Sequence, residues 1–483
     1  VLVTAALLCV GCGRTPIDVS EESVQRPETS TTCTVAVTYE AGYPQGEDAS
    51  LDSLGDAYIP QAGNGGYDVR HYDIVLNCNP KTGALEGSTS IAAMALRDLE
   101  AFNLDLAGLD ILEVKLDGAL VAYERLGQEL TVECPRPLPA GSDFSVAVAY
   151  SGRPRPIRSM YDFLPMGWQR KGDTIYTLDE PEGAATWYPL NDHPSDKATY
   201  SFRLTVPEPY VAVATGVLME IEENGADQTF VWEMRQPMAN YLAGVAVGDF
   251  VLEETVSPNG VPIRNYFDRR LAEKAKRVFA RTGEMLAYFS ETFGSYPFEV
   301  YGVVLPDAAV GGAMENQTLS LFGRDLFQGS MSRTVTAELY ISHELAHQWF
   351  GNSVTPAEWQ DIWLNEGFAT YASWLWSEHD RGEDGMAMWL DRALRVVARE
   401  DDVPPGDPGI DELFGTSVYQ RGALTLHALR LTVGDDLFFE MIREWVSRYE
   451  HGNATTEDFI ALSLEKAGHL PGVDVAALLD AWL

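Results

Sequence analysis

Two histidines and a glutamate in the middle of the chain have the residue types and the spacing of a metal-dependent hydrolytic site. His343, Glu344 and His347 form the pattern H-E-x-x-H in a stretch whose apolar residues have helical spacing and which contains no Pro or Gly before Gly351. At 3.6 residues per turn, positions four apart share one face of a helix, so both imidazoles can point at one ion. Glu344 lies one residue along, where its carboxylate can reach a water molecule on that ion.

A third candidate ligand follows in a second stretch with helical spacing. Eighteen residues separate His347 from Glu366, which lies between Asn365 and Gly367 in the segment WLNEGFATYASWLW. A bare H-E-x-x-H also occurs in ordinary amphipathic helices, but a carboxylate arriving in its own helix favours a metal site. Two His and one Glu form the three-ligand zinc set that leaves a fourth position open, as catalytic sites do. The sequence therefore predicts one catalytic zinc per chain.

Three motifs together identify a family resemblance. HELAHQWFGN, WLNEGFA and the upstream GGAMEN of residues 311–316 resemble the aminopeptidase N family of zinc metallopeptidases. The resemblance extends from about Tyr72 to the last residue. It implies a zinc-dependent aminopeptidase, which would release N-terminal amino acids from peptides by attack of a metal-activated water.

The resemblance also implies catalytic roles for two residues. Glu344 matches the general base, which takes a proton from the water and passes it to the leaving amine. Tyr419 in SVYQRGA matches the tyrosine whose hydroxyl stabilises the oxyanion, although Gln420-Arg421 stands where relatives usually have a Lys after one residue.

Recognition of a free α-ammonium group requires carboxylates placed to meet it. Glu315 of GGAMEN matches the family's recognition glutamate, and Glu180 of TLDEPEG matches the acidic residue contributed by the N-terminal domain. Gly312 and Ala313 resemble the segment whose extended backbone pairs with the substrate. The implied partners are peptides with a free N-terminus.

Composition limits the other partners. The 483 residues include 72 acidic and 34 basic side chains, a formal net charge of −38. Long-range repulsion therefore excludes nucleic acid and anionic lipid surfaces as favourable partners. A chain of this length is expected to divide into two or three domains.

The first residues predict export. Residues 1–12 form an apolar run too short to span a bilayer, and Val10-Gly11-Cys12 resembles a bacterial lipoprotein cleavage site with Cys12 as the lipidated residue. A plain secretory signal and a chance apolar start are the alternatives. Residues 13–66 read as a flexible tether. We thus expect an extracytoplasmic protein of the bacterial cell envelope that contacts the membrane only through a lipid anchor.

The remaining chain predicts an α+β multidomain protein. Alternating apolar runs over residues 67–256 predict an N-terminal β-sandwich or saddle domain. Residues 257–483 predict a thermolysin-like, mainly helical zinc-peptidase domain, beginning with one long amphipathic helix that ends near Gly294. Cys78 and Cys134 could form a disulfide or remain buried free thiols.

Two rival functions stay open at this stage. An endopeptidase or an epoxide hydrolase could use the same zinc ligands, although Glu180 and Glu315 together count against the endopeptidase. A catalytically silent peptide-binding protein belongs to another class, and it has no need of a complete set of ligands with Glu344 and Tyr419.

Overall fold

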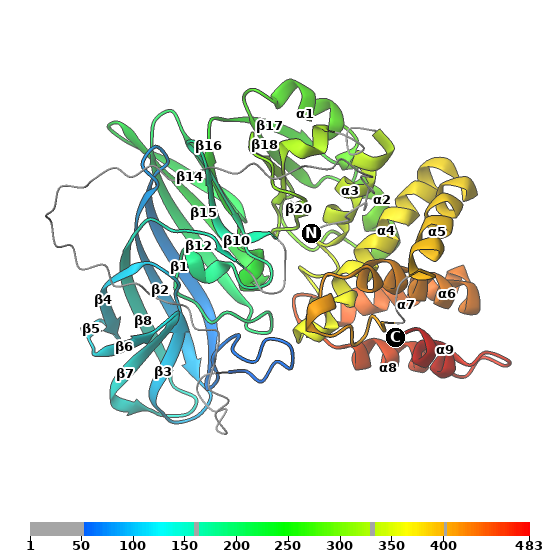
Figure 1. Ribbon diagram of the computed structural model, residues 1–483, viewed down its shortest axis with the longest axis horizontal. Coiled ribbons are helices and arrows are strands. Elements are labelled where there is room, and N and C mark those ends of the chain that lie inside the picture. Colours follow the sequence, from blue (N-terminus) through cyan, green and yellow to red (C-terminus); the bar gives the residue numbers. More distant parts are fainter. Residues whose placement is uncertain (1–52, 159–163, 329–333, 400–402) are drawn as a thin grey trace, which may run out of the picture.

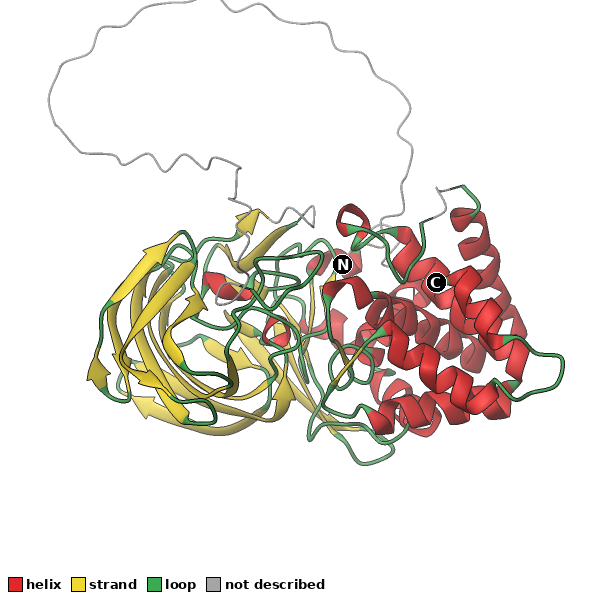
Figure 2. Cartoon of the chain, turned by 90° about the horizontal axis from the view of Figure 1, so that it is seen from below, coloured by secondary structure: helices red, strands yellow, loops and turns green. Residues whose placement is uncertain are grey.

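The computed structural model describes residues 53–158, 164–328, 334–399 and 403–483. A β-rich half and a mainly helical half lie side by side (Figure 1), and the view from below separates yellow strands from red helices in the same way (Figure 2). The predicted order, a β domain followed by a mainly helical domain, is confirmed. Among the described residues, no helix is long and apolar enough to cross a membrane.

The largest sheet of the first domain has eight strands. Along β12 buried and half-buried residues alternate, because successive side chains point to opposite faces of a strand. β1 and β12 pair in parallel, and the other neighbours are antiparallel. In sheet order the strands are β14 (Val217–Asn224), β15 (Asp227–Met238), β12 (Ala198–Pro207), β1 (Tyr67–Asn79), β2 (Ala84–Ala95), β8 (Asp143–Gly152), β4 (Asp110–Leu116) and β5 (Ala119–Leu120).

Two smaller sheets complete the first domain. One contains β3 (Leu99–Asp105), β7 (Glu129–Leu138) and β6 (Tyr123–Leu126), and the other contains β13 (Val211–Ala214), β16 (Val245–Gly248), β11 (Thr174–Leu178), β10 (Pro165–Lys171) and β9 (Ile157–Arg158). Every residue of β11 and β16 is buried. The end of β11 lies two residues before Glu180, so this buried sheet fixes where that carboxylate emerges.

The second domain opens with a mixed five-stranded sheet. Its order is β17 (Phe250–Val256), β18 (Pro262–Asp268), β19 (Val303–Leu305), β21 (Ser320–Phe322) and β20 (Ala313–Met314). β18, β19 and β21 are parallel, whereas β17 and β20 are antiparallel to their neighbours. The boundary predicted between residues 256 and 257 falls inside the β17–β18 hairpin. By strand pairing, the second domain begins at Phe250, a position that alternating apolar residues alone did not indicate.

Helices pack beside this sheet (Figure 1); two of them lie between β18 and β19 in the chain, and the others follow β21. They are α1 (Ala272–Val278), α2 (Thr282–Phe293), α3 (Thr334–Ala346), α4 (Trp363–Arg381), α5 (Glu383–Val397), α6 (Gly422–Val433), α7 (Asp435–Arg448), α8 (Thr456–Ala467) and α9 (Val475–Trp482). The single long helix predicted before Gly294 is wrong, because the chain turns between α1 and α2 where the Thr282 amide donates to the Phe279 carbonyl. The predicted end is correct, since Gly294 has φ of +113°.

The last part of the predicted tether is packed rather than flexible. Asp56 is 2% exposed. Its carboxylate accepts a hydrogen bond from the Trp359 amide at 2.8 Å and lies 3.3 Å from Nε2 of His193. Asn64, fully buried, donates to Asp105. Residues 53–66 therefore belong to the folded protein, because their polar side chains are matched to partners in both domains. Cys12 and residues 1–52 lie outside the described residues.

Cys78 and Cys134 are free thiols, the first buried and the second partly exposed. Burial raises the pKa of both thiols. Of the two alternatives for Cys78 and Cys134, a disulfide or free thiols, the structure therefore has the free thiols.

Candidate active site

The metal ligands predicted from the sequence come from two neighbouring helices. His343 and Glu344 lie in the last turn of α3, and Glu366 lies in the first turn of α4. His347 follows the last residue of α3, but its amide still bonds to the His343 carbonyl at 3.2 Å, which keeps the two imidazoles on one face. The helix dipole of α4 favours a carboxylate at its N-terminal end.

The three donor atoms form a triangle of the size that zinc requires. His343 Nε2 lies 3.0 Å from Glu366 Oε2 and 3.1 Å from His347 Nε2, and His347 Nε2 lies 3.4 Å from Glu366 Oε2. Zinc held tetrahedrally at about 2.0–2.2 Å from each donor separates pairs of donors by about 3.3 Å. Two ring nitrogens and one carboxylate oxygen are also the donors that zinc prefers, so the residues fit this metal.

The His347 ring is oriented by a backbone carbonyl. Its Nδ1 lies 3.0 Å from the carbonyl oxygen of Phe350. A hydrogen bond donated from Nδ1 leaves the lone pair of Nε2 for the metal, as in other histidine-ligated sites. The turn that places this carbonyl contains Gly351, whose φ of +115° favours glycine.

The electrostatics of the polypeptide favour a cation between these groups. Burial opposes ionisation of Glu366, but the imidazoles of His347 and His343 outweigh it and hold the pKa of this carboxyl well below its ordinary range. Burial also disfavours a charged His347, yet the carboxylates of Glu315 and Glu366 raise its pKa to about 10. Several negative groups thus attract a positive charge to one point.

Glu344 has the environment of a general base. Its side chain is 4% exposed, and one of its oxygens lies within 4.8 Å of ligand atoms of Glu315 and His347. Burial raises the pKa of this carboxyl to about 8, although His347 acts in the opposite direction. A raised pKa makes a carboxylate a better proton acceptor at neutral pH.

Glu180 and Glu315 lie beside the metal ligand Glu366. Oxygens of these three residues all lie within 4.8 Å of one another, and each of the three residues is 1% exposed. Glu180 comes from the first domain and Glu315 follows β20 in the second. Burial raises the pKa of Glu315. The site is therefore assembled across the domain boundary and presents several buried carboxylates to one small volume.

Tyr419 lies beside His343 and close to the carboxylates of the site. It lies in a π-helical turn (Ser417–Arg421) directly before α6, and π-helical turns are frequent at functional sites. Its ring stacks on that of His343 with centroids 6.1 Å apart. Burial, followed by the carboxylates of Glu366 and Glu180, raises the pKa of the phenol well above its ordinary value. The hydroxyl therefore keeps its proton and can donate a hydrogen bond.

Gly312 and Ala313 lie at the edge of the second domain's sheet. Ala313 begins β20, which pairs with β21 on one side and is the last strand in the sheet order. An edge strand can accept an extended peptide as an additional strand. The two residues therefore lie at the start of the strand that ends the sheet, two and three residues before Glu315.

Two amide side chains that hold Glu315 in place were not predicted from the sequence. Asn352 Nδ2 donates to the Glu315 carbonyl at 2.7 Å, and Gln348 Nε2 donates to the same carbonyl at 3.2 Å. Gln348 Oε1 also accepts from the Thr318 amide at 2.8 Å. Gln348 and Asn352 follow His347 by one and five residues, but nothing in the sequence indicates their contacts with Glu315.

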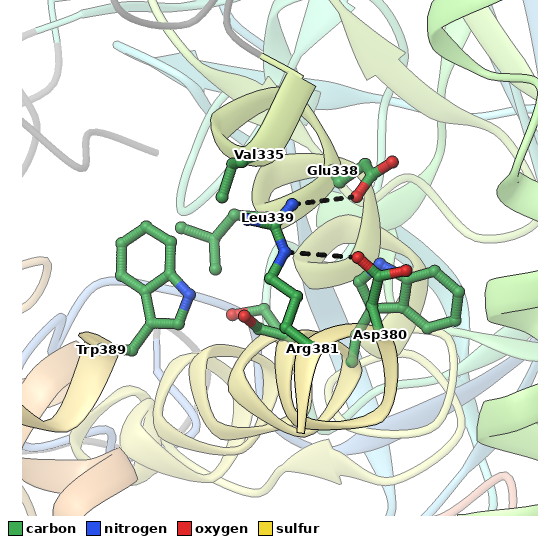
Figure 3. Close-up of a pocket in the computed structure, with 9 residues that line it drawn as sticks. Val335, Glu338, Leu339, Asp380, Arg381 and Trp389 are labelled. Atoms are coloured by element: carbon green, nitrogen blue, oxygen red, sulfur yellow. Dashed lines mark hydrogen bonds and ion pairs between the residues drawn. The ribbon is translucent and has the colours of Figure 1, made fainter. Parts of the chain in front are cut away.

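A network of ion pairs joins α3 and α4 near a small cavity (Figure 3). Arg381 of α4 extends between Glu338 of α3, 4.0 Å away, and Asp380, 3.3 Å away. Arg281 contacts the same two carboxylates at 3.2 and 2.9 Å. The network therefore joins α3 to the last turn of α4, at the end of that helix opposite Glu366.

The two-histidine, one-glutamate set with a glutamate general base defines the gluzincin class of metallopeptidases, and the two-domain fold agrees with it. The model of the peptidase family M1 domain matches residues 278–482, and that of the peptidase M1 N-terminal domain matches residues 69–242. The chain belongs to peptidase family M1.

Known relatives support this assignment. An M1 zinc metallopeptidase from Deinococcus radiodurans, one of whose crystal structures is a mutant bound to the substrate Tyr-Ser-Ala, superimposes with a TM-score of 0.81 and 33% identity, over 89% of this chain and 97% of that one. Aminopeptidase M1 of Arabidopsis thaliana is 31% identical over 65% of this chain and 37% of its own length. Aminopeptidase 2 of Candida albicans is 26% identical over 85% of this chain and 46% of its own. The chain thus spans half or less of these two curated relatives.

Proposed function

We propose that the protein is a zinc-dependent aminopeptidase that releases N-terminal amino acids from peptides. The observation that carries this proposal is the convergence of Glu180 and Glu315 beside Glu366, with oxygens within 4.8 Å of one another. Such a group of carboxylates needs a cation, and the α-ammonium group of a peptide supplies one. The curated relatives bear the name aminopeptidase, which supports the same reading.

Each chemical role in this proposal belongs to a residue of the site. His343, His347 and Glu366 hold zinc, the cofactor that the donor set and the family both indicate. When bound, zinc lowers the pKa of a water molecule in its open position to about 7 and polarises the scissile carbonyl. Glu344 accepts a proton from the attacking water and returns it to the leaving amine. Tyr419 donates its hydroxyl hydrogen to the oxyanion.

The carboxylates decide which bond is cleaved. Glu180 and Glu315 bind the α-ammonium group at one end of the site, and the edge of β20 pairs with the first residues of the peptide. Both carboxylates lie within 4.8 Å of the metal ligand Glu366, so an ammonium group bound there would bring the first peptide bond close to the metal ligands. Release from the N-terminus follows from this geometry.

The experiment compares peptides of one sequence with free and acetylated N-termini. The wild-type protein should cleave the free peptide stepwise and the acetylated peptide very poorly, because acetylation removes the charge that the carboxylates bind. Glu315→Gln should lower the rate and weaken this discrimination together, since the lost contact also positions the carbonyl. Glu378→Gln, which weakens the ion pair between Glu378 of α4 and Arg430 of α6, is the matched control and should preserve both.

The products separate the proposal from its rivals. Internal cleavage of the acetylated peptide at the rate of the free one would identify an endopeptidase and overturn the exopeptidase assignment while leaving the zinc site intact. Absence of cleavage in a protein with full zinc occupancy, tested over a panel of aminoacyl fluorogenic substrates, would identify a silent peptide-binding protein.

We further propose that the protein is exported in bacteria and anchored through lipid on Cys12. The support is the apolar run of residues 1–11, which ends in Val10-Gly11 directly before Cys12. Stable anchoring needs two acyl chains, and lipidation of the cysteine at such a site would supply them. Mass spectrometry of the full chain expressed in a bacterium should show an acylated Cys12 in the membrane fraction, and Cys12→Ala should leave that fraction. An unmodified Cys12 in the wild-type chain refutes the anchor.

A further inference from the structure

One lysine of the first domain donates to three backbone carbonyls of the second. Lys197, directly before β12, places its Nζ 3.0 Å from the carbonyl oxygen of Asn352, 3.0 Å from that of Ser353 and 3.2 Å from that of Gly452. An ammonium group has three N–H donors, so each can bond to one carbonyl. Among the described residues, other side chains that bond to a backbone carbonyl across the boundary make fewer bonds; for example, Asn453 Nδ2 donates to the Pro194 carbonyl.

The three carbonyls belong to two segments close to the active site. Asn352 and Ser353 lie in the turn that follows His347, where the amide of Asn352 donates to the His347 carbonyl at 3.0 Å. Gly452 directly precedes β23 (Asn453–Ala454), which pairs in parallel with β22 (Thr355–Pro356) after that turn. One ammonium group therefore joins the first domain to both segments.

The same turn fixes the recognition glutamate. Asn352 has its backbone carbonyl bound by Lys197 and its side-chain amide bound to the carbonyl of Glu315 at 2.7 Å. A continuous series of hydrogen bonds thus runs from the first domain, through Asn352, to the residue that meets the substrate. Glu180 arrives from the first domain on the other side, so the relative placement of the domains sets the separation of the two carboxylates.

Resting on the proposed function, we infer that Lys197 is a positioning residue for recognition of the substrate's α-ammonium group. It touches neither substrate nor metal ligand. By holding the turn at residues 352–353 against the first domain, it keeps Glu315 and Glu180 at the separation that one ammonium group can bridge. The donor count explains the residue type, because Met offers no donor and the planar fork of Arg does not direct three N–H groups at converging carbonyls.

The cost of burial agrees with a positional role. Desolvation lowers the pKa of Lys197 to about 7, so the charged form is held at a cost in stability. A side chain retained only for packing has no such cost. The cost is consistent with a charged group that is kept because it fixes the geometry across the domain boundary.

The test uses two inhibitors that differ only in the presence of the ammonium group. The first is the amino-acid hydroxamate glycine hydroxamate, and the second is acetohydroxamate, which is the same molecule without the amine. In Lys197→Met, KM and the inhibition constant of the amino-acid hydroxamate should rise by about tenfold to a hundredfold. The inhibition constant of acetohydroxamate and the zinc content of one per chain should not change.

Two further variants make the result decisive. Lys274→Met is the matched control, because Lys274 also donates to a backbone carbonyl, that of Phe327, but within the second domain and away from the site. It should leave both inhibitors unaffected. Asn352→Ala removes only the contact with Glu315, and combined with Lys197→Met it should add little to the loss, since both act through one series of contacts. Asn352→Ala alone keeps the test available where Lys197→Met does not fold.

The outcomes separate this inference from the proposed function. A wild-type protein that binds both hydroxamates equally contradicts ammonium recognition itself. A wild-type protein that prefers the amino-acid hydroxamate, with the preference unchanged in Lys197→Met and in Asn352→Ala, overturns the role of Lys197 alone. An equal weakening of both inhibitors in Lys197→Met also overturns it, because that result reflects damage to the metal site.

Discussion

At the scale of single residues, the metal ligands and the base have separable roles. His347→Ala removes one of three donors, so elemental analysis should show loss of zinc together with loss of activity. Glu344→Gln keeps the ligand set, so it should retain one zinc per chain while kcat falls by roughly a hundredfold to ten-thousandfold. Full zinc occupancy in His347→Ala would contradict the ligand assignment.

Tyr419 allows a prediction about the transition state. Its hydroxyl bonds to charge that develops only during the reaction, so Tyr419→Phe should lower kcat by about a hundredfold to a thousandfold and change KM little. Steady-state kinetics on the wild-type protein and this variant at equal zinc content are the measurement. The ring contact with His343 remains in Phe, so the zinc content should not change. A rise in KM at unchanged kcat would assign Tyr419 to substrate binding instead.

A site residue could be predicted from the sequence only where its spacing from other site residues is specific. His343, His347 and Glu366 follow from helical geometry and donor chemistry, because spacing along a helix fixes which side chains share a face. Glu180 and Tyr419 required a family resemblance, since nothing in their local sequence fixes a position in space. Gln348 and Asn352 gave no signal, because buried amides acquire their role only from contacts between distant segments.

At the scale of secondary-structure elements, the ion pairs between α3 and α4 should stabilise the catalytic domain. Glu338→Gln weakens the contacts with Arg281 and Arg381, so it should lower the free energy of unfolding by about 1 kcal/mol and the Tm by a few degrees. Calorimetry is the measurement. Asp391→Asn breaks an ion pair with Arg395 whose side chains are 60% and 68% exposed, so as a control it should have no measurable effect. Equal shifts in both variants would show that the network adds nothing.

Element boundaries show where local sequence loses its predictive value. The apolar stripe continues across residues 279–281, and neither Pro nor Gly marks the turn between α1 and α2. The turn is set instead by packing, as shown by Phe279, 3% exposed and in ring contact with Phe267 of β18 and Phe322 of β21. Likewise, α3 ends at Ala346 although the apolar residues continue to Phe350, because the chain must turn at Gly351 to bring the Phe350 carbonyl to His347.

At the scale of the whole molecule, the net charge of −38 should make stability depend on salt. Repulsion among 72 acidic side chains outweighs attraction to 34 basic ones, and screening shortens its range from about 30 Å at 0.01 M to about 3 Å at 1 M salt. The Tm should therefore rise from low salt to about 0.5 M NaCl, where the screening length is only a few ångströms. KCl should act equally, because screening does not distinguish the two cations. A fall in Tm with NaCl would show that the ion pairs dominate instead.

The arrangement of the two domains was predictable only in outline. Alternating strand patterns followed by helical patterns indicate a β domain and a helical domain. The contacts that join them are single polar bonds between residues far apart in the chain, such as Lys197 with Asn352 and Asp56 with Trp359. No periodicity marks such residues, so their partners become known only from the folded chain.

The packing of residues 53–66 has a consequence for synthesis on the ribosome. Asp56 bonds to the amide of Trp359, 303 residues later, and Tyr58 bonds to Asp407, 349 residues later. At translation rates of roughly 5–20 residues per second, Asp56 waits about 15–60 seconds after its own synthesis for that partner to be made. The strands of the first domain are complete long before then. Residues 53–66 are therefore translated before both domains but are among the last to reach their final place, and they can dock only when both domains have folded.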